Sequence, residues 1–139
     1  MMRFWFVFMS MFLPVICWGQ IIVKETGGMA AFPLVSSHKT VIYYDAGDYG
    51  VVEKTACLLA EDIKRVTNKK VPVSSKKVSS EYAVVVGTVG HNAFIDRLVA
   101  EGQLDVSAIS GGWEQFVIKT IEVPVKGVKK VLVIAGCDR

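Results

Sequence analysis

The run Glu81–Gly90, EYAVVVGTVG, constrains the fold more than any other stretch of this sequence. Its tyrosine and valines are residue types that fit a pleated, buried surface. Because the apolar residues do not alternate with polar ones, both faces of the resulting strand should be covered. Gly87 and Gly90 then permit a tight turn, and a helical pattern follows directly. We therefore expect a central strand that leads into a helix, as in an α/β sheet.

A helix is expected over Gly50–Thr67. Apolar residues recur there at steps of three and four, so one stripe should bury against a sheet. The members of this stripe are Val52, Ala56, Leu59, Ile63 and Val66. Asp48 is placed to cap the helix by accepting from its first free N–H groups. Glu61 and Arg65 have the four-residue spacing of an ion pair.

A second helix is expected over Asn92–Glu101. Phe94 and Leu98, with Ile95 and Val99, should form its buried side. Gly102 suits the left-handed position that ends many helices. Leu104–Ile109 is expected to add one further helical turn, capped by Asp105 and broken by the glycines that follow.

Runs of β-branched and aromatic residues predict the other strands. They are Thr40–Tyr44, Phe116–Val123 and Lys130–Ala135, with short ones at Ile21–Val23 and Val71–Val73 and a short extended segment at Phe32–Val35. The short connection containing Gly127 predicts an antiparallel hairpin between the last two. The fold class expected is therefore α/β (α+β), a mixed β-sheet with two main helices packed on it.

The first nineteen residues have the pattern of a secretory signal peptide. Arg3 supplies a positive start, Phe4–Ile16 is apolar, and a cut is expected before Gln20. The apolar run is short of the roughly 20 residues that span a bilayer. We expect a secreted or periplasmic chain whose single domain is 20–139. Lipid anchoring at Cys17 is the alternative, although the large Ile16 before that cysteine argues against it.

The sequence supplies no complete catalytic, cofactor or metal motif. His38 and His91 lie far apart, and neither has a partner at ligand spacing, so both are interpreted as surface or turn histidines. The Gly87–Asn92 loop has neither dinucleotide nor P-loop spacing and is interpreted as a structural turn. The formal charge of +3 includes Arg3 and does not indicate nucleic-acid binding.

Other polar and aromatic residues have both a binding and a structural interpretation. The triplet Lys-Lys-Val begins at Lys69, Lys76 and Lys129, and such basic loops could attract an acidic polysaccharide if they converged. Solvated loop charge is the simpler interpretation. The rings of Tyr43, Tyr44, Tyr49 and Trp113 could face sugars or close the edge of a core.

The acidic residues and cysteines have structural explanations. Asp45 and Asp48 fit turn and cap positions better than the paired carboxylates of a glycosidase. Cys57 and Cys137 are expected to be unpaired thiols, with Cys57 packed like a small apolar residue.

The chain also resembles a known family. The residues that carry the likeness are VIYYDAGD at 41–48, LAEDIKRVTNKKVPV at 59–73, YAVVVGTVGHNAFIDRL at 82–98, GGWEQFVI at 111–118 and VLVIAGCDR at 131–139. In this order and spacing they resemble the N-terminal region of glycoside hydrolase family 115, the bacterial α-glucuronidases that act on xylan.

The resemblance implies a small α/β accessory domain, similar to the one that precedes the barrel in hexosaminidases and α-glucuronidases. The family's catalytic acids belong to the barrel, so it assigns no catalytic, cofactor or metal residue to this sequence. The expected partners are that barrel and, as a second candidate, xylan or an acidic glycan, with no nucleic acid and no membrane after signal cleavage. The apolar strand before Gly136–Arg139 has no following helix to cover it, so we expect a truncated sequence. The alternative is a free-standing secreted module whose Gly87–Asn92 loop or basic loops bind an anion or an acidic glycan.

Overall fold

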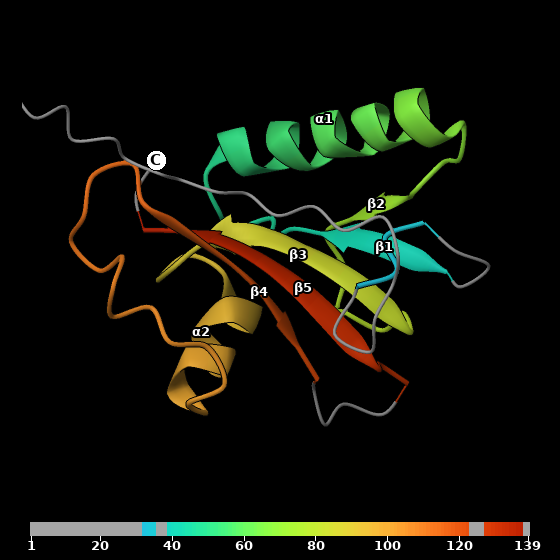
Figure 1. The fold of residues 1–139 in the computed structure, drawn as a ribbon. Coiled ribbons are helices and arrows are strands. Elements are labelled where there is room, and N and C mark those ends of the chain that lie inside the picture. The colour runs from blue at the N-terminus through green and yellow to red at the C-terminus, as the bar shows by residue number, and fades with distance from the viewer. Residues whose placement is uncertain (1–31, 36–38, 123–126, 138–139) are drawn as a thin grey trace, which may run out of the picture.

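The computed structural model describes residues 32–35, 39–122 and 127–137 (Figure 1). Its elements are β1 (Thr40–Tyr43), α1 (Gly50–Thr67), β2 (Val73–Ser74), β3 (Tyr82–Thr88), α2 (Ala93–Ala100), β4 (Phe116–Ile121) and β5 (Lys130–Gly136). The expected signal peptide, the short strand at Ile21–Val23 and His38 lie outside the described residues.

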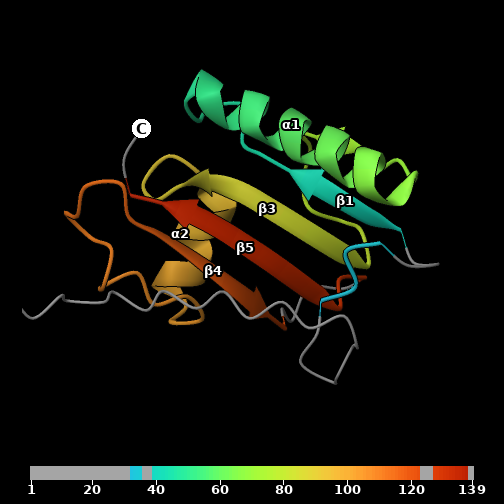
Figure 2. The same ribbon diagram turned by 45° about the horizontal axis from the view of Figure 1, so that its top comes forward.

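The five strands form one mixed sheet in the order β2-β1-β3-β5-β4. β1 pairs in parallel with β2 and β3, and β3 pairs in parallel with β5. β4 runs antiparallel to β5, which confirms the expected hairpin. α1 lies on one face of the sheet and α2 on the other (Figures 1 and 2). β3 is therefore the central strand, as its continuous apolar run predicts.

Alternate residues of β3 serve two separate cores. Val84 and Val86 face α1 and pack with Val52, Ala56 and Ile63. Ala83 and Val85 face the other way, among Ile95 and Leu98 of α2 and Val131, Val133 and Ala135 of β5. Because side chains alternate along a strand, an unbroken run of apolar residues is what two covered faces require.

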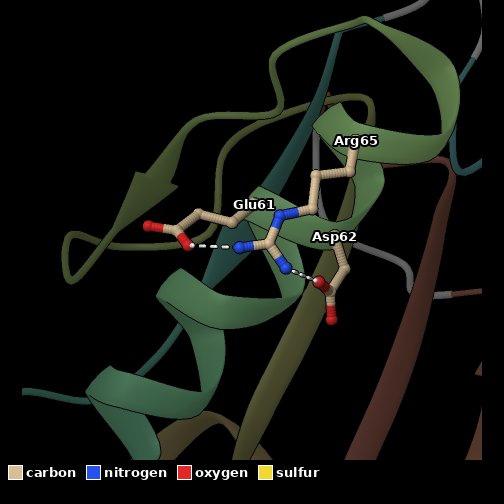
Figure 3. A network of polar contacts seen from close by, with 3 residues as sticks. All are labelled: Glu61, Asp62 and Arg65. Carbon is tan, nitrogen blue, oxygen red and sulfur yellow. Dashed lines mark hydrogen bonds and ion pairs between the residues drawn. The ribbon is translucent and has the colours of Figure 1, made fainter.

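α1 has the bounds that its periodicity predicts. Glu61, Asp62 and Arg65 form the charged surface of its last turns, with Arg65 3.8 Å from Glu61 and 3.2 Å from Asp62 (Figure 3). The expected stripe fails at one residue, because Val66 is 86% exposed. Periodicity reports which side of the helix a residue occupies, but not whether another element lies opposite it. Cys57 is also exposed rather than buried, since one residue beyond Ala56 is a rotation of roughly 100° away from the sheet.

α2 begins at a buried cap. The side chain of Asn92 accepts hydrogen bonds from the N–H groups of Phe94 and Ile95 at 3.1 and 3.2 Å. Ile95 and Leu98 are fully buried. After the helix, Gly102 adopts a φ of 70°, and its N–H donates to Val99, so it ends the helix in the left-handed conformation that was expected.

Prolines account for two differences from the expected strands. Phe32–Val35 forms a bend in which the N–H of Leu34 donates to Phe32 at 3.0 Å, and Pro33 has no N–H to give to a strand partner. Strand β2 begins at Val73 rather than Val71, after Pro72. At Leu104–Ile109 the N–H of Ser110 donates to Val106 at 3.0 Å, as in one turn of helix, and Asp105 accepts from the N–H of Ser107 at 2.9 Å, as expected of its cap.

Among the described residues, no element covers one apolar surface of the sheet beside α1. Ile118 of β4 lies opposite Ile134 of β5, on the face that carries Val84 and Val86. α1 packs over β1, β2 and β3 rather than over this pair. We call this surface the uncovered face; it consists of Phe116 and Ile118 on β4, Leu132 and Ile134 on β5, and Val51 and Leu58 on α1.

Helical geometry shows which side of α1 borders the uncovered face. Ala60, Glu61 and Lys64 line a pocket with Val71 and Pro72, beside β2. Val51 and Leu58 are seven residues apart and share the opposite flank, toward β5. Their side chains are 53% and 59% exposed, and those of Phe116 and Ile118 are 65% and 57% exposed.

Gly87 is expected to tolerate no side chain, because of its distance to the cap of α2. A Cβ at this position would stand 2.9 Å from both Cβ and Cγ of Asn92, which is 2% exposed. Gly87→Ala should lower the free energy of unfolding by about 2 kcal/mol or more, since it overpacks the site and displaces the cap. Urea denaturation measures the change.

Gly50→Ala is the matched control, because a Cβ there meets no atom within 4 Å and α1 begins at this residue. It should leave stability unchanged or raise it by up to about 1 kcal/mol. Equal effects of the two substitutions would contradict the close approach of Gly87 and Asn92.

Candidate functional site

The parallel strands end at one edge of the sheet, where the chain reverses its winding direction. After β1 the chain enters α1 on one face, and after β3 it enters α2 on the other (Figure 2). Open α/β sheets place ligand sites outside the carboxyl ends of the strands at such a switch point. The loops 44–49 and 89–92 are therefore the first place to look for chemistry.

Asp48 joins the first of these loops to the end of β3 instead of capping α1. Its Oδ1 accepts from the N–H of Tyr49 at 2.7 Å, and its Oδ2 accepts from the N–H of Thr88 at 2.8 Å. The residue at the cap position is Tyr49, whose side chain makes no cap hydrogen bond. The cap predicted for Asp48 is therefore wrong, because the end of β3 offers its carboxylate a donor that sequence spacing does not reveal.

Asp45 makes a second connection between the same loops. Its Oδ1 accepts from the N–H of Gly47 at 2.9 Å, which is the expected turn, and its Oδ2 accepts from the N–H of Ala93 at 3.1 Å. These bonds from Gly47 and Ala93 hold the pKa of the Asp45 carboxyl below its usual value. With Asn92 serving Phe94 and Ile95, three N–H groups in the first turn of α2 already have acceptors. The Gly87–Asn92 loop is thus built as a structural turn.

Tyr49 and His91 meet across the switch point. The hydroxyl of Tyr49 lies 2.9 Å from Nε2 of His91, and the ring centroids are 4.5 Å apart. His91 occupies a turn, as expected. Within the described residues, no three His, Cys, Asp or Glu side chains gather closely enough to hold a metal ion.

A pocket of about 280 Å³ opens next to these loops, on the α2 side of the sheet. Its lining comes from the end of β1, the segment after β2, the middle of β3 and the first turns of α2. The lining residues are Tyr43, Tyr44, Asp45, Ser75, Lys76, Lys77, Val78, Val85, Asn92, Ala93, Phe94 and Arg97. This pocket is the candidate binding site of the described structure.

The structure separates the three basic triplets. Lys76 lines the candidate pocket, whereas Lys69 lines another pocket, together with Leu34 and Pro72. Lys129 forms an ion pair with Glu81 at the start of β3. The triplets therefore do not converge on one surface.

The aromatic residues and cysteines are also dispersed. Tyr43 and Tyr44 line the candidate pocket, Tyr49 lies against His91, and Trp113 is 81% exposed in the segment before β4. Cys57 and Cys137 are both free thiols. The thiol of Cys137 donates to the carbonyl oxygen of Gly112 at 3.0 Å and so ties the end of β5 to the turn before β4.

Sequence reasoning missed Arg97 and Phe94 as pocket residues. Phe94 was assigned only a buried position on the helix and Arg97 was assigned no role, yet the guanidinium of Arg97 lies 5.1 Å from the centroid of the Phe94 ring and both residues line the pocket. A cation three residues after an aromatic residue in a first turn is the signal that was present. This signal points to a pocket only when the segment after β2 is known to lie opposite Phe94 and Arg97.

The sequence matches no known family model. No curated protein matches it either. Among the described residues, no helix has the length and apolarity needed to cross a membrane.

Asp45 should make the stability of the protein depend on pH. Because its pKa is lowered in the folded state, ionised Asp45 contributes stability above the unfolded pKa of about 4, and this contribution is lost as the pH falls through the folded value. Asp45→Asn should therefore cost on the order of 1 kcal/mol at pH 7, and the difference should shrink toward pH 3. Urea denaturation of both proteins between pH 3 and 7 measures it. A difference that stays constant over this range would exclude the role given to the carboxylate.

Proposed function

We propose that this chain is the N-terminal, non-catalytic accessory domain of a secreted glycoside hydrolase of the xylan α-glucuronidase type. The parent enzyme would remove glucuronic acid, or its methyl ether, from xylan side chains. Its catalytic acids would lie on a barrel domain. The resemblance of the five sequence segments to family 115 is the source of this proposal.

The uncovered face is the observation that best supports an accessory role. Four of its side chains, Val51, Leu58, Phe116 and Ile118, are more than half exposed, and Ile118 lies opposite half-buried Ile134 in the β4–β5 pair. Contiguous exposed apolar surface of this kind is typical of an interaction site. We propose that the catalytic barrel of the parent enzyme packs on this face, since burying it removes apolar surface from water at about 25 cal/mol per Å².

Leu58 and Cys57 provide a test on neighbouring positions of one helix. The chain and the barrel of a xylan α-glucuronidase, produced as separate polypeptides, should co-elute in size-exclusion chromatography. Leu58→Asp should abolish co-elution, because it places a charge on the uncovered face. Cys57→Asp should preserve it, since Cys57 is exposed on the flank near Tyr44. Loss of the complex with both variants, or with neither, would argue against this face.

The chain alone should release no uronic acid from glucuronoxylan. In the proposed arrangement the groups that cleave the glycosidic bond belong to the barrel, so adding the barrel should be necessary for hydrolysis. Anion-exchange chromatography of the products checks this. Turnover by the purified chain, retained after repeated purification, would disprove the non-catalytic role.

A further inference from the structure

The candidate pocket combines an apolar interior with a cationic rim. Tyr43, Val78 and Val85 are buried members of the core on the α2 side, and they line the pocket from within. The hydroxyl of Tyr43 lies 3.4 Å from the N–H of Ser79 and accepts from it. This contact holds the segment after β2 against the end of β1, so the walls of the pocket are positioned before any ligand arrives.

The charges of the lining favour an anion. Lys76, Lys77 and Arg97 contribute three cations, and both lysines are exposed at the rim. Asp45 is the one acidic residue of the lining, and both of its carboxylate oxygens already accept backbone hydrogen bonds. Arg97 also lies 3.8 Å from Glu101, which offsets part of its charge. The two lysines therefore form the least compensated charge at the opening.

Size and aromatic lining narrow the class of ligand. A volume of about 280 Å³ is near the lower end of the range for small-molecule sites, which suits a single sugar ring better than a long chain. Phe94 is a half-buried ring in the lining. The side chain of Tyr44 packs toward α1, where its hydroxyl donates to Glu53 at 3.0 Å, so it is not counted as a ligand contact. The apolar face of the Phe94 ring can pack against the C–H face of a sugar while polar groups set its orientation.

We propose that this pocket binds a small anionic sugar, with Lys76 and Lys77 pairing with its anionic group and the ring of Phe94 contacting its ring. The anionic group could be the carboxylate of a uronic acid or the phosphate of a sugar phosphate, because both present several oxygen acceptors to ammonium donors. The pocket lies on the α2 side of the sheet and the uncovered face on the α1 side. Sugar binding therefore does not depend on the proposed enzyme assembly.

Nuclear magnetic resonance titration of the purified chain tests this directly. Glucuronate or glucose 6-phosphate should shift the backbone amide signals of residues 75–78 and 93–97, and glucose at the same concentration should not. Shifts with only one of the two anions would support the pocket and identify the source of the anionic group. Shifts with glucose equal to those with the anions, or no shifts with any of the three, would overturn the proposal.

The repeated Lys-Lys-Val triplet supplies a control with the same loss of charge. Lys76→Gln with Lys77→Gln should weaken binding at least about tenfold, because it removes two charged donors. Lys69→Gln with Lys70→Gln lowers the net charge equally but at another pocket, and should change affinity by less than about twofold. Equal weakening by both double variants would mean general electrostatic attraction and would overturn the assignment. Both should unfold at the temperature of the unsubstituted chain, since all four side chains are exposed.

Discussion

Two-sided burial of β3 is the constraint on which the rest of this structure depends. A strand whose successive residues are all apolar cannot leave either face in water, so it needs a helix or a further layer on both sides. Val84 and Val86 obtain this from α1, and Ala83 and Val85 obtain it from α2. Fully burying a valine side chain is worth about 1.5 kcal/mol or more. The strand therefore fixes where both helices lie.

This arrangement brings the loops after β1 and β3 to one edge, and there the acidic residues act on the backbone. Asp48 accepts from Thr88 and so links the loop after β1 to the end of β3. Asp45 accepts from Ala93 and so links the same loop to the start of α2. N–H groups at the start of a helix attract anions, and here the carboxylate of Asp45 and the side-chain oxygen of Asn92 already occupy them. The switch point is consequently held together by the same groups that could otherwise have bound a ligand.

The two faces of the sheet differ in chemistry as a result of the strand order. On the α1 side, the helix covers β1, β2 and β3, and the hairpin of β4 and β5 leaves Ile118 and Phe116 exposed. On the α2 side, the segment after β2 passes near the end of β1 and encloses a pocket with Lys76 and Lys77 at its rim. The apolar surface suits a protein partner and the cationic pocket suits a small anion, so the two proposed roles can coexist in one domain.

The sequence by itself determined the local elements and the class of fold. The period of Gly50–Thr67, the valine run of β3 and the stop of α2 at Gly102 are short-range signals that act within a few residues, and each predicted the observed element. The hairpin of β4 and β5 followed from a short connection, which leaves few other ways for two strands to pair. Of the pocket residues, the triplet beginning at Lys76, the rings of Tyr43 and Tyr44, and Asn92 in the Gly87–Asn92 loop had been considered for binding, whereas Phe94 and Arg97 had not.

Tertiary structure alone decided what each side chain meets. Asp48 finds Thr88, forty residues away, and Lys77 and Arg97 share a pocket although they come from different elements. Val66 follows the apolar stripe of α1 yet is 86% exposed, because none of the described elements lies opposite it. Periodicity and spacing describe one segment at a time, whereas burial and ligand geometry depend on pairs of segments, and their placement is set by the packing of the whole sheet.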